Sequence, residues 1–237
     1  MENNLLTRYS EITEKNPREI VLLRGSGCKW RRCAFCDYHL DFSLDEKSNY
    51  ELNRLELAKV TGKYGKLEVI NSGSFVDLDQ KTFSSIIDTC INKKIDEIHF
   101  ECHWMHKDSI PSLRKAFEKY NIITKIKIGV ETFDSDYREN ILHKGIDVQE
   151  PSKIAERFDE VCLLFGLDGQ TLNSMKQDIE TGLSYFERVC VNIMVENSTK
   201  IKPNNDVIRT FIKELYPIYK DNKRVDILIE NTDFGVG

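Results

Sequence analysis

The sequence predicts an α/β protein whose parallel strands form either a partial barrel or an open sheet. Short β-branched or apolar runs alternate with stretches of helical period along the whole chain. This alternation is typical of parallel βα units, and six units with a last strand are too few to close an eight-stranded barrel. The 237 residues contain no linker or low-complexity segment, so we expect a single domain over residues 1–237.

The expected strands are rich in valine, isoleucine and leucine, as strands buried on both faces are. They span residues 19–25, 66–73, 97–102, 125–132, 160–166, 189–196 and 225–230. The expected helices repeat apolar residues every three or four positions, which gives each one face that can pack on the sheet. They span residues 50–61, 79–92, 108–120, 171–186 and 204–220. In either architecture, reactive side chains gather where the parallel strands end.

The composition is that of an ordinary globular protein, with 40% hydrophobic and 31% charged residues. No apolar run approaches the roughly 18 residues of a membrane helix, and the N-terminus lacks the features of a signal peptide. We therefore expect a cytoplasmic protein without membrane attachment. The net charge of −5 favours a small substrate over a nucleic acid, whose phosphates call for clustered cations. In a reducing compartment the seven cysteines are thiols or metal ligands.

Three cysteines follow the first expected strand at the spacing C-x4-C-x2-C, namely Cys28, Cys33 and Cys36. Thiolates are soft ligands that suit iron–sulfur clusters and zinc. On a [4Fe–4S] cluster, three cysteines leave one iron free to bind a cofactor or substrate. Two alternatives are a zinc site completed by His39, in a non-catalytic zinc-binding module, and a group of buried structural cysteines. The other four cysteines fall within expected helices or strands, where we expect a buried apolar role.

This loop and later segments resemble the radical S-adenosylmethionine (radical SAM) superfamily. The usual spacing there is C-x3-C-x2-C with an aromatic residue before the last cysteine; here one residue is added and Phe35 supplies the aromatic ring. Residues 71–77 resemble the second-strand motif whose backbone contacts SAM. Residues 129–132 resemble the fourth-strand G-[LV]-E-[TS] motif. Residues 165–171 resemble the fifth-strand G-L-P-G-Q-T motif, with Asp168 in place of proline.

The resemblance implies a partial (βα)6 barrel of parallel strands, a [4Fe–4S] cluster on Cys28, Cys33 and Cys36, and SAM as a second cofactor. In this superfamily an electron from the reduced cluster cleaves SAM, and the resulting radical abstracts a hydrogen atom from the substrate. An electron donor such as flavodoxin or ferredoxin is then an expected partner. The expected SAM contacts are Phe35, Tyr38, Ser72, Gly73, Ser74, Glu101 and Glu131.

Within the superfamily the chain as a whole resembles the queuine lyases, which act in queuosine salvage by splitting queuine and releasing 7-aminomethyl-7-deazaguanine. The expected substrate is therefore a free modified 7-deazaguanine base. Carboxylates are suitable partners for three parts of this base: its amine, which is expected to be cationic, its guanine-like edge of hydrogen-bond donors, and its diol. The expected substrate contacts are Asp168, Glu196, Glu230 and Asp233. A radical SAM enzyme that modifies a tRNA base or another small metabolite is the alternative.

Overall fold

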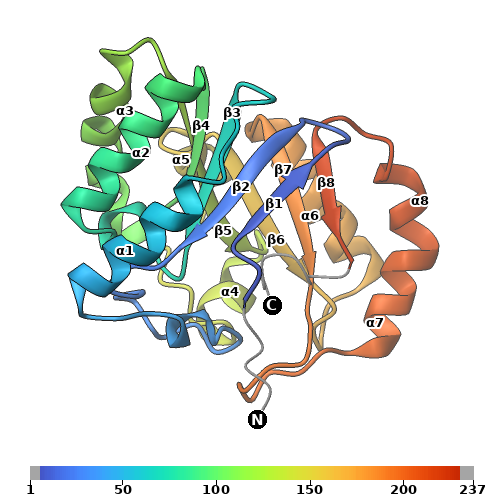
Figure 1. Ribbon diagram of the computed structural model, residues 1–237. Coiled ribbons are helices and arrows are strands. Elements are labelled where there is room, and N and C mark those ends of the chain that lie inside the picture. The colour runs from blue at the N-terminus through green and yellow to red at the C-terminus, as the bar shows by residue number, and fades with distance from the viewer. Residues whose placement is uncertain (1–5, 230–237) are drawn as a thin grey trace.

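Eight strands form one curved sheet in the computed structural model, which describes residues 6–229 (Figure 1). The strands follow one another across the sheet in chain order. The first pair is antiparallel, and each later strand runs parallel to the one before it. The strands are β1 (Tyr9–Ile12), β2 (Arg18–Leu23), β3 (Lys66–Asn71), β4 (Glu97–Glu101), β5 (Ile123–Glu131), β6 (Glu160–Phe165), β7 (Arg188–Ile193) and β8 (Val225–Leu228).

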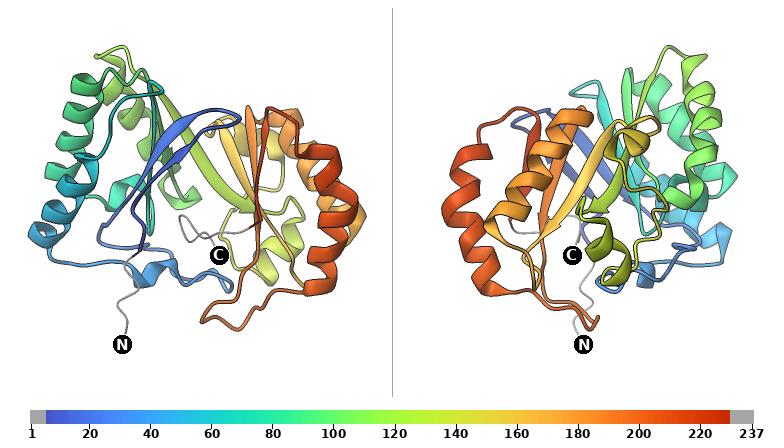
Figure 2. Two further views of the ribbon diagram at one scale, coloured as in Figure 1. Left: turned by 45° about the vertical axis from the view of Figure 1, so that its right-hand side comes forward. Right: turned by 180° about the vertical axis from the view of Figure 1, so that it is seen from behind.

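Helices cover the outer face of this sheet and leave its inner face uncovered, as the two views of Figure 2 show. The result is a half-barrel with β1 and β8 at its two edges. The helices are α1 (Glu46–Leu57), α2 (Gln80–Lys93), α3 (Ile110–Glu118), α4 (Ser135–Asn140), α5 (Pro151–Ala155), α6 (Leu172–Tyr185), α7 (Asn205–Thr210) and α8 (Tyr216–Tyr219). Shorter 3-10 turns span Tyr38–Leu40, Phe75–Asp77 and Trp104–Ser109.

Alternate strand residues divide between the two faces of the sheet, as the period of two requires. In β4, Ile98 and Phe100 lie in the main hydrophobic core under the helices, whereas His99 between them contacts charged groups on the inner face. The Phe100 ring packs against that of Phe117 on α3, with 5.6 Å between ring centroids. The outer face therefore stabilises the fold, and the inner face is free to carry polar chemistry.

The predicted parallel βα units and partial barrel are confirmed, and every expected strand is present. Three short elements were not predicted from the sequence: β1, α4 and α5. The single helix expected over 204–220 is instead interrupted by a π-helical segment, Phe211–Leu215, just before Pro217. Proline at this position removes a backbone donor, so regular α-helical bonding cannot continue through it. Between residues 6 and 229, no helix has both the length and the apolar character needed to span a membrane.

Candidate functional site

Two adjoining cavities occupy the inside of the half-barrel. The first, which we call the cysteine cavity, has a volume of about 150 Å³ and is lined by the three cysteines of the loop after β2. The second, the side cavity, has a volume of about 330 Å³ and lies between the β1–β2 turn on one side and α8 with β8 on the other. Both cavities are lined by Ile70, Glu101, Lys127, Cys162 and Asn192.

The three loop cysteines carry free thiols and are partly exposed to the cysteine cavity. Cys33 and Cys36 pack against a small apolar cluster that includes Phe35 and Leu164. Burial raises the pKa of the Cys33 thiol and raises that of Cys36 to about 12, while the Lys144 ammonium acts in the opposite direction. A metal that binds such a thiol displaces its proton outright, so these thiols suit a metal centre that supplies the missing positive charge.

Backbone hydrogen bonds hold the cysteine loop against other strand ends. The Cys28 N–H donates to the Ser72 carbonyl after β3 at 2.9 Å, and the Ala34 N–H donates to the Leu142 carbonyl at 3.0 Å. The Asn197 side-chain amide, beyond β7, donates to the Phe35 carbonyl at 2.7 Å. The loop is thus fixed by segments that follow three different strands, which positions its thiols before any ligand binds.

An ion pair between Glu131 and Lys144 forms part of the cysteine cavity wall. Lys144 Nζ lies 2.6 Å from Glu131 Oε1. The pair depends on a bulge in β5, where the register shifts between Gly129 and Glu131 and Glu131 adopts a φ of +70°. A side chain at position 129 would place its Cβ 2.5 Å from the Glu131 carboxylate and 2.9 Å from the Lys144 ammonium, so it would displace this ion pair. A non-glycine residue at positive φ stores strain, as functional sites often do.

A buried ion triplet lies deeper in the half-barrel and lines the side cavity. The Glu68 carboxylate accepts a hydrogen bond from Arg18 Nε at 2.5 Å and contacts the Lys127 ammonium. All three side chains are at most 8% exposed. Although burial opposes it, Lys127 and Arg18 hold the pKa of the Glu68 carboxyl well below its usual range. Glu68 is therefore ionised and fully engaged with two cations.

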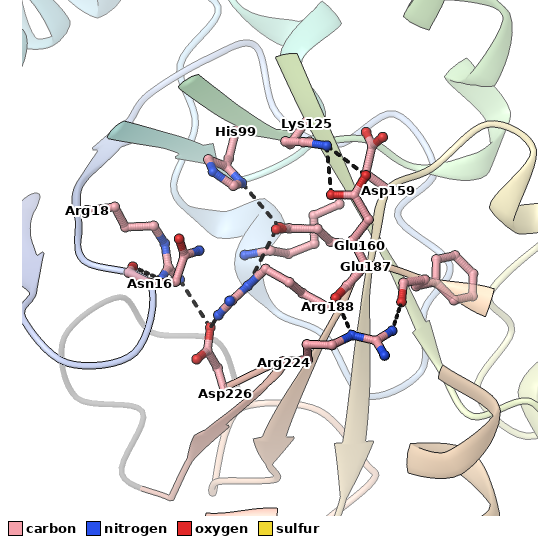
Figure 3. Close-up of polar contacts among 12 residues, drawn as sticks. Asn16, Arg18, His99, Lys125, Asp159, Glu160, Glu187, Arg188, Arg224 and Asp226 are labelled. Carbon is pink, nitrogen blue, oxygen red and sulfur yellow. Dashed lines mark hydrogen bonds and ion pairs between the residues drawn. The ribbon is translucent and has the colours of Figure 1, made fainter. Parts of the chain in front are cut away.

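A second charged group continues this wall toward β7 and β8, as Figure 3 shows. Arg188 lies between two carboxylates, with Nη2 2.5 Å from Asp226 and Nε 3.6 Å from Glu160. His99 Nδ1 lies 3.3 Å from Glu160 Oε2. Asp226 also lies 3.6 Å from an Arg18 nitrogen, which joins the two groups. In this part of the inner wall, each of these charged side chains is consequently paired with at least one charge of opposite sign.

Glu101 differs from these carboxylates. It ends β4 and lines both cavities, yet its side chain has no hydrogen bond or ion pair with any of residues 6–229. Burial raises the pKa of its carboxyl to about 7. His103, two residues further on, is neutral by contrast, because burial and the nearby Lys144 lower its pKa to about 4. The His103 ring stacks on Trp30 and donates from Nε2 to the Lys144 carbonyl at 2.9 Å.

The structure brings most of the expected site residues to the cysteine cavity. Ser74 is the exception among the expected SAM contacts, because it does not line the cysteine cavity. It is buried, and its hydroxyl accepts a hydrogen bond from the His103 N–H at 2.9 Å. The expected residues that line the cavity are Cys28, Cys33, Phe35, Cys36, Tyr38, Ser72, Gly73, Glu101 and Glu131.

Two of the four expected substrate contacts, Asp168 and Glu196, lie outside both cavities. Asp168 is exposed and accepts a hydrogen bond from the Asn204 amide at 2.5 Å. Glu196 is exposed as well and pairs with Lys202 at 2.6 Å. Glu230 and Asp233 lie outside the described residues.

Several cavity residues were missed by reasoning from the sequence. Lys127, Cys162 and Asn192 line both cavities, and Cys190 lines the side cavity. Cys162 and Cys190 are buried, as expected, but on the inner wall and not in the apolar core that holds Cys90. The sequence does contain a pattern that could have identified them. Polar residues recur at alternate positions within the apolar strands, and this period of two indicates a polar inner face of the sheet.

Comparisons with known proteins complete the description of the site. No protein-family model matches the chain. A solved structure of queuine lyase from Clostridium spiroforme, bound to SAM and queuine, is 43% identical, has a TM-score of 0.92, and matches over 98% of this chain and 99% of that one. The heme chaperone HemW of Bacillus subtilis is 25% identical over 166 residues. An uncharacterized protein of Methanocaldococcus jannaschii is 24% identical over 145 residues. The matches span only 44% and 38% of these last two relatives.

Proposed function

Because the chain belongs to the queuine lyase family of radical SAM enzymes, we propose that it cleaves queuine and releases 7-aminomethyl-7-deazaguanine. The observation that carries this proposal is the 43% identity, over almost the whole of both chains, to a queuine lyase with SAM and queuine bound. The two adjoining cavities of this chain agree with it, because they offer separate spaces for a cofactor and a substrate in contact with each other.

Radical SAM enzymes carry a [4Fe–4S] cluster, and we assign its protein ligands to Cys28, Cys33 and Cys36. These are three free thiols of one loop, and all line one cavity. Among the side chains of residues 6–229 that the structure describes, no three Cys, His, Asp or Glu converge on a single metal ion. A cluster does not need such convergence, because each thiolate binds a different iron. The 43% identity to a queuine lyase with SAM bound supports a cluster, and not a zinc ion, at these three thiols.

The cysteine cavity is the proposed SAM site. When bound, the cluster and SAM together supply a carbon-centred radical that removes a hydrogen atom from the substrate. The backbone at Ser72 and Gly73 can approach SAM closely, and Glu131, held by Lys144, offers a fixed carboxylate to it. The Phe35 and Tyr38 rings complete the wall. Apolar side chains nearby keep other hydrogen donors away from the reacting atoms; they are Leu22, Ile70 and Leu164.

The side cavity is the proposed queuine site. It shares its inner wall with the cysteine cavity, so a base placed there presents one end to the SAM site. Its outer border consists of residues from two separate segments, Glu14 and Lys15 on the β1–β2 turn and Tyr216 and Lys220 at the two ends of α8. The Lys15 ammonium bridges this border, since it donates to the Lys220 carbonyl at 2.8 Å and to the Val225 carbonyl at 2.6 Å.

A one-electron donor, such as flavodoxin or ferredoxin, is the redox partner that this chemistry requires. We further propose a cytoplasmic location and a free base as substrate, not a base within tRNA. The net charge of −5 supports the free base, because a nucleic-acid surface would need an excess of cations.

The proposal predicts that reduced, reconstituted protein converts queuine to 7-aminomethyl-7-deazaguanine when SAM is present. The measurement is anaerobic incubation followed by mass spectrometry of the bases, with protein lacking the cluster as control. Queuosine-containing tRNA is assayed in parallel. Absence of product from queuine, or much faster conversion of the tRNA, would contradict the proposed function.

A substitution at Gly73 tests the position of the SAM site. A methyl group there would lie 2.5 Å from an Asp77 carboxylate oxygen and 3.0 Å from the Cys28 backbone nitrogen. The Asp77 carboxylate can swing aside, but the Cys28 backbone must shift by a few tenths of an ångström, so Gly73→Ala should disturb the cysteine loop and weaken SAM binding by roughly tenfold. Calorimetric titration of the reconstituted protein with SAM measures this.

Gly169→Ala is the control for that experiment. Gly169 has a φ of +84°, so alanine is strained there, but its Cβ would meet nothing closer than a Tyr137 ring carbon at 3.4 Å. This variant should lose some stability and keep its affinity for SAM. Equal SAM affinity in both variants would mean that the SAM site is not beside Gly73.

A further inference from the structure

Glu101 is the one acidic residue in the described cavity walls that is both partly buried and without a side-chain partner. The acidic residues that line the two cavities are Glu14, Glu68, Glu101, Glu131 and Asp226. Three of them are ion-paired within the protein: Glu68, Glu131 and Asp226. Glu14 is exposed on the β1–β2 turn. A partly buried carboxylate that faces a cavity without a partner points to a cationic or hydrogen-bond-donating partner that arrives from outside.

The protein's own cations near Glu101 are already committed. Lys127 is the partner of Glu101 in the β4–β5 register, but its ammonium contacts Glu68. Lys144 gives its ammonium to Glu131. Glu101 therefore faces a cavity in which a ligand can supply the missing positive charge.

The position of Glu101 fixes which part of a ligand it can meet. It is the one described acidic residue that lines both cavities. In the reaction proposed above, the bond that breaks joins the cyclopentenediol to the secondary amine, which must therefore lie next to the SAM site. A base held in the side cavity brings that amine to the boundary where Glu101 stands.

Resting on the proposed function, we propose that Glu101 recognises the cationic secondary amine of queuine and so selects amine-bearing 7-deazaguanines over uncharged ones. A charge-assisted hydrogen bond from the amine to the carboxylate is short and strong in such a setting. Glu101 is thus a substrate-specificity residue, in place of the role in SAM binding expected from the sequence. It holds the nitrogen of the bond that breaks while the rest of the base lies in the side cavity.

This pairing makes binding depend on pH. Burial raises the pKa of Glu101 to about 7, with Glu68 and Glu131 adding to the rise and Lys127 and Lys144 opposing it. Below this pKa the free enzyme must lose a proton from Glu101 before the cation can bind. Affinity for queuine should therefore increase as the pH rises from 6 to 8, as long as the amine itself stays protonated.

The test compares Glu101→Gln with the wild type in anaerobic, reconstituted protein that contains SAM. Dissociation constants are measured for queuine, for the cationic 7-aminomethyl-7-deazaguanine and for the uncharged 7-cyano-7-deazaguanine. The wild type should bind the two amines at least tenfold more tightly than the nitrile at pH 8. Glu101→Gln should lose this preference and its pH dependence, with SAM affinity unchanged within twofold. Glu101→Asp, which keeps the charge, should retain the preference in part.

Glu118→Gln, at an exposed position on α3, is the matched control and should behave as the wild type. A Glu101→Gln protein that still prefers the amines tenfold would overturn the inference and leave the proposed function standing. So would a variant that instead loses affinity for SAM more than tenfold, because Glu101 would then serve the cofactor. A wild type that neither binds nor cleaves queuine would overturn the proposed function, and this inference with it.

Discussion

Replacing Cys33 by alanine is expected to remove the iron–sulfur cluster and, with it, all cleavage of SAM. Cys33 lies between the other two loop cysteines in sequence, and all three line one cavity. With two thiols left, a cubane that already has one open iron would have only two protein ligands. Iron and sulfide content after anaerobic reconstitution, together with the yield of 5′-deoxyadenosine, measures the effect. We expect both to fall by at least roughly 100-fold, because the chemistry depends on the cofactors.

Cys90→Ala is the matched control for this substitution. Cys90 lies in α2 and is fully buried in the hydrophobic core, away from both cavities. Its loss removes only a small buried group, which costs on the order of 1 kcal/mol of stability. Iron content and SAM cleavage should be retained. A Cys33→Ala protein with full iron content would show that the cluster, if present, has other ligands.

Most of the fold could be predicted from the sequence because each of β2 to β8 carries apolar, often β-branched residues on at least the face that packs under the helices. The alternation of these short segments with amphipathic helical segments indicates parallel pairing. The missed strand β1 has the sequence YSEI, lies at an edge, and is half-buried along its length. An edge strand of four residues has neither the apolar run nor the length that a pattern needs. The short helices α4 and α5 were missed for the same reason, since one turn shows no periodicity.

The cysteine cavity could be predicted where its residues are close together in the chain. The cysteine loop comes directly after β2, and Gly73 comes directly after β3. The rule that reactive side chains gather at the carboxyl ends of parallel strands therefore selects both. The same rule also selects Asp168 and Glu196, but the segments after β6 and β7 turn both side chains toward solvent. The rule fixes which end of the sheet carries the site, and it does not fix the direction of each loop side chain.

The inner wall could not be predicted with the same certainty, because its partners come from strands far apart in sequence. Glu68 and Lys127 are 59 positions apart, and only the curvature of the sheet brings them together. Each looks like a polar interruption of an apolar run when its own strand is read alone. In the sheet register His99 lies opposite Glu68, and Glu101 lies opposite Lys127, so these interruptions together form a single polar face.

Replacing Glu68 by glutamine is expected to lower the stability of the protein more than any of the other proposed substitutions. Glutamine keeps the size of the side chain but leaves the buried cations of Arg18 and Lys127 without the carboxylate between them. Removing one member of a buried ion group usually costs about 3–5 kcal/mol, because the charges that remain are uncompensated. In a chain of this size that corresponds to a melting temperature lower by roughly 6–20 °C. Thermal unfolding of the reconstituted protein at pH 7 measures it.

The size of this effect should depend on pH in a defined direction. The folded protein holds the pKa of Glu68 well below the value of about 4.5 that applies to the unfolded chain. A carboxyl with a lowered pKa binds fewer protons when folded, so its contribution to stability is complete above pH 4.5 and is lost as the pH falls below that value. The difference in melting temperature between wild type and Glu68→Gln should therefore be constant near neutrality and shrink in acid.

Two further variants separate the charge effect from a general disturbance of the core. Glu51→Gln makes the same chemical change in an exposed pair, where Glu51 and Arg54 are both about half exposed, and should alter stability by less than about 0.5 kcal/mol. The double variant Glu68→Gln, Lys127→Met removes one of the unpaired cations and should recover part of the lost stability. If Glu68→Gln melts within 2 °C of the wild type, the triplet contributes little to stability, and the carboxylate would then have to be tested for a role in binding the base.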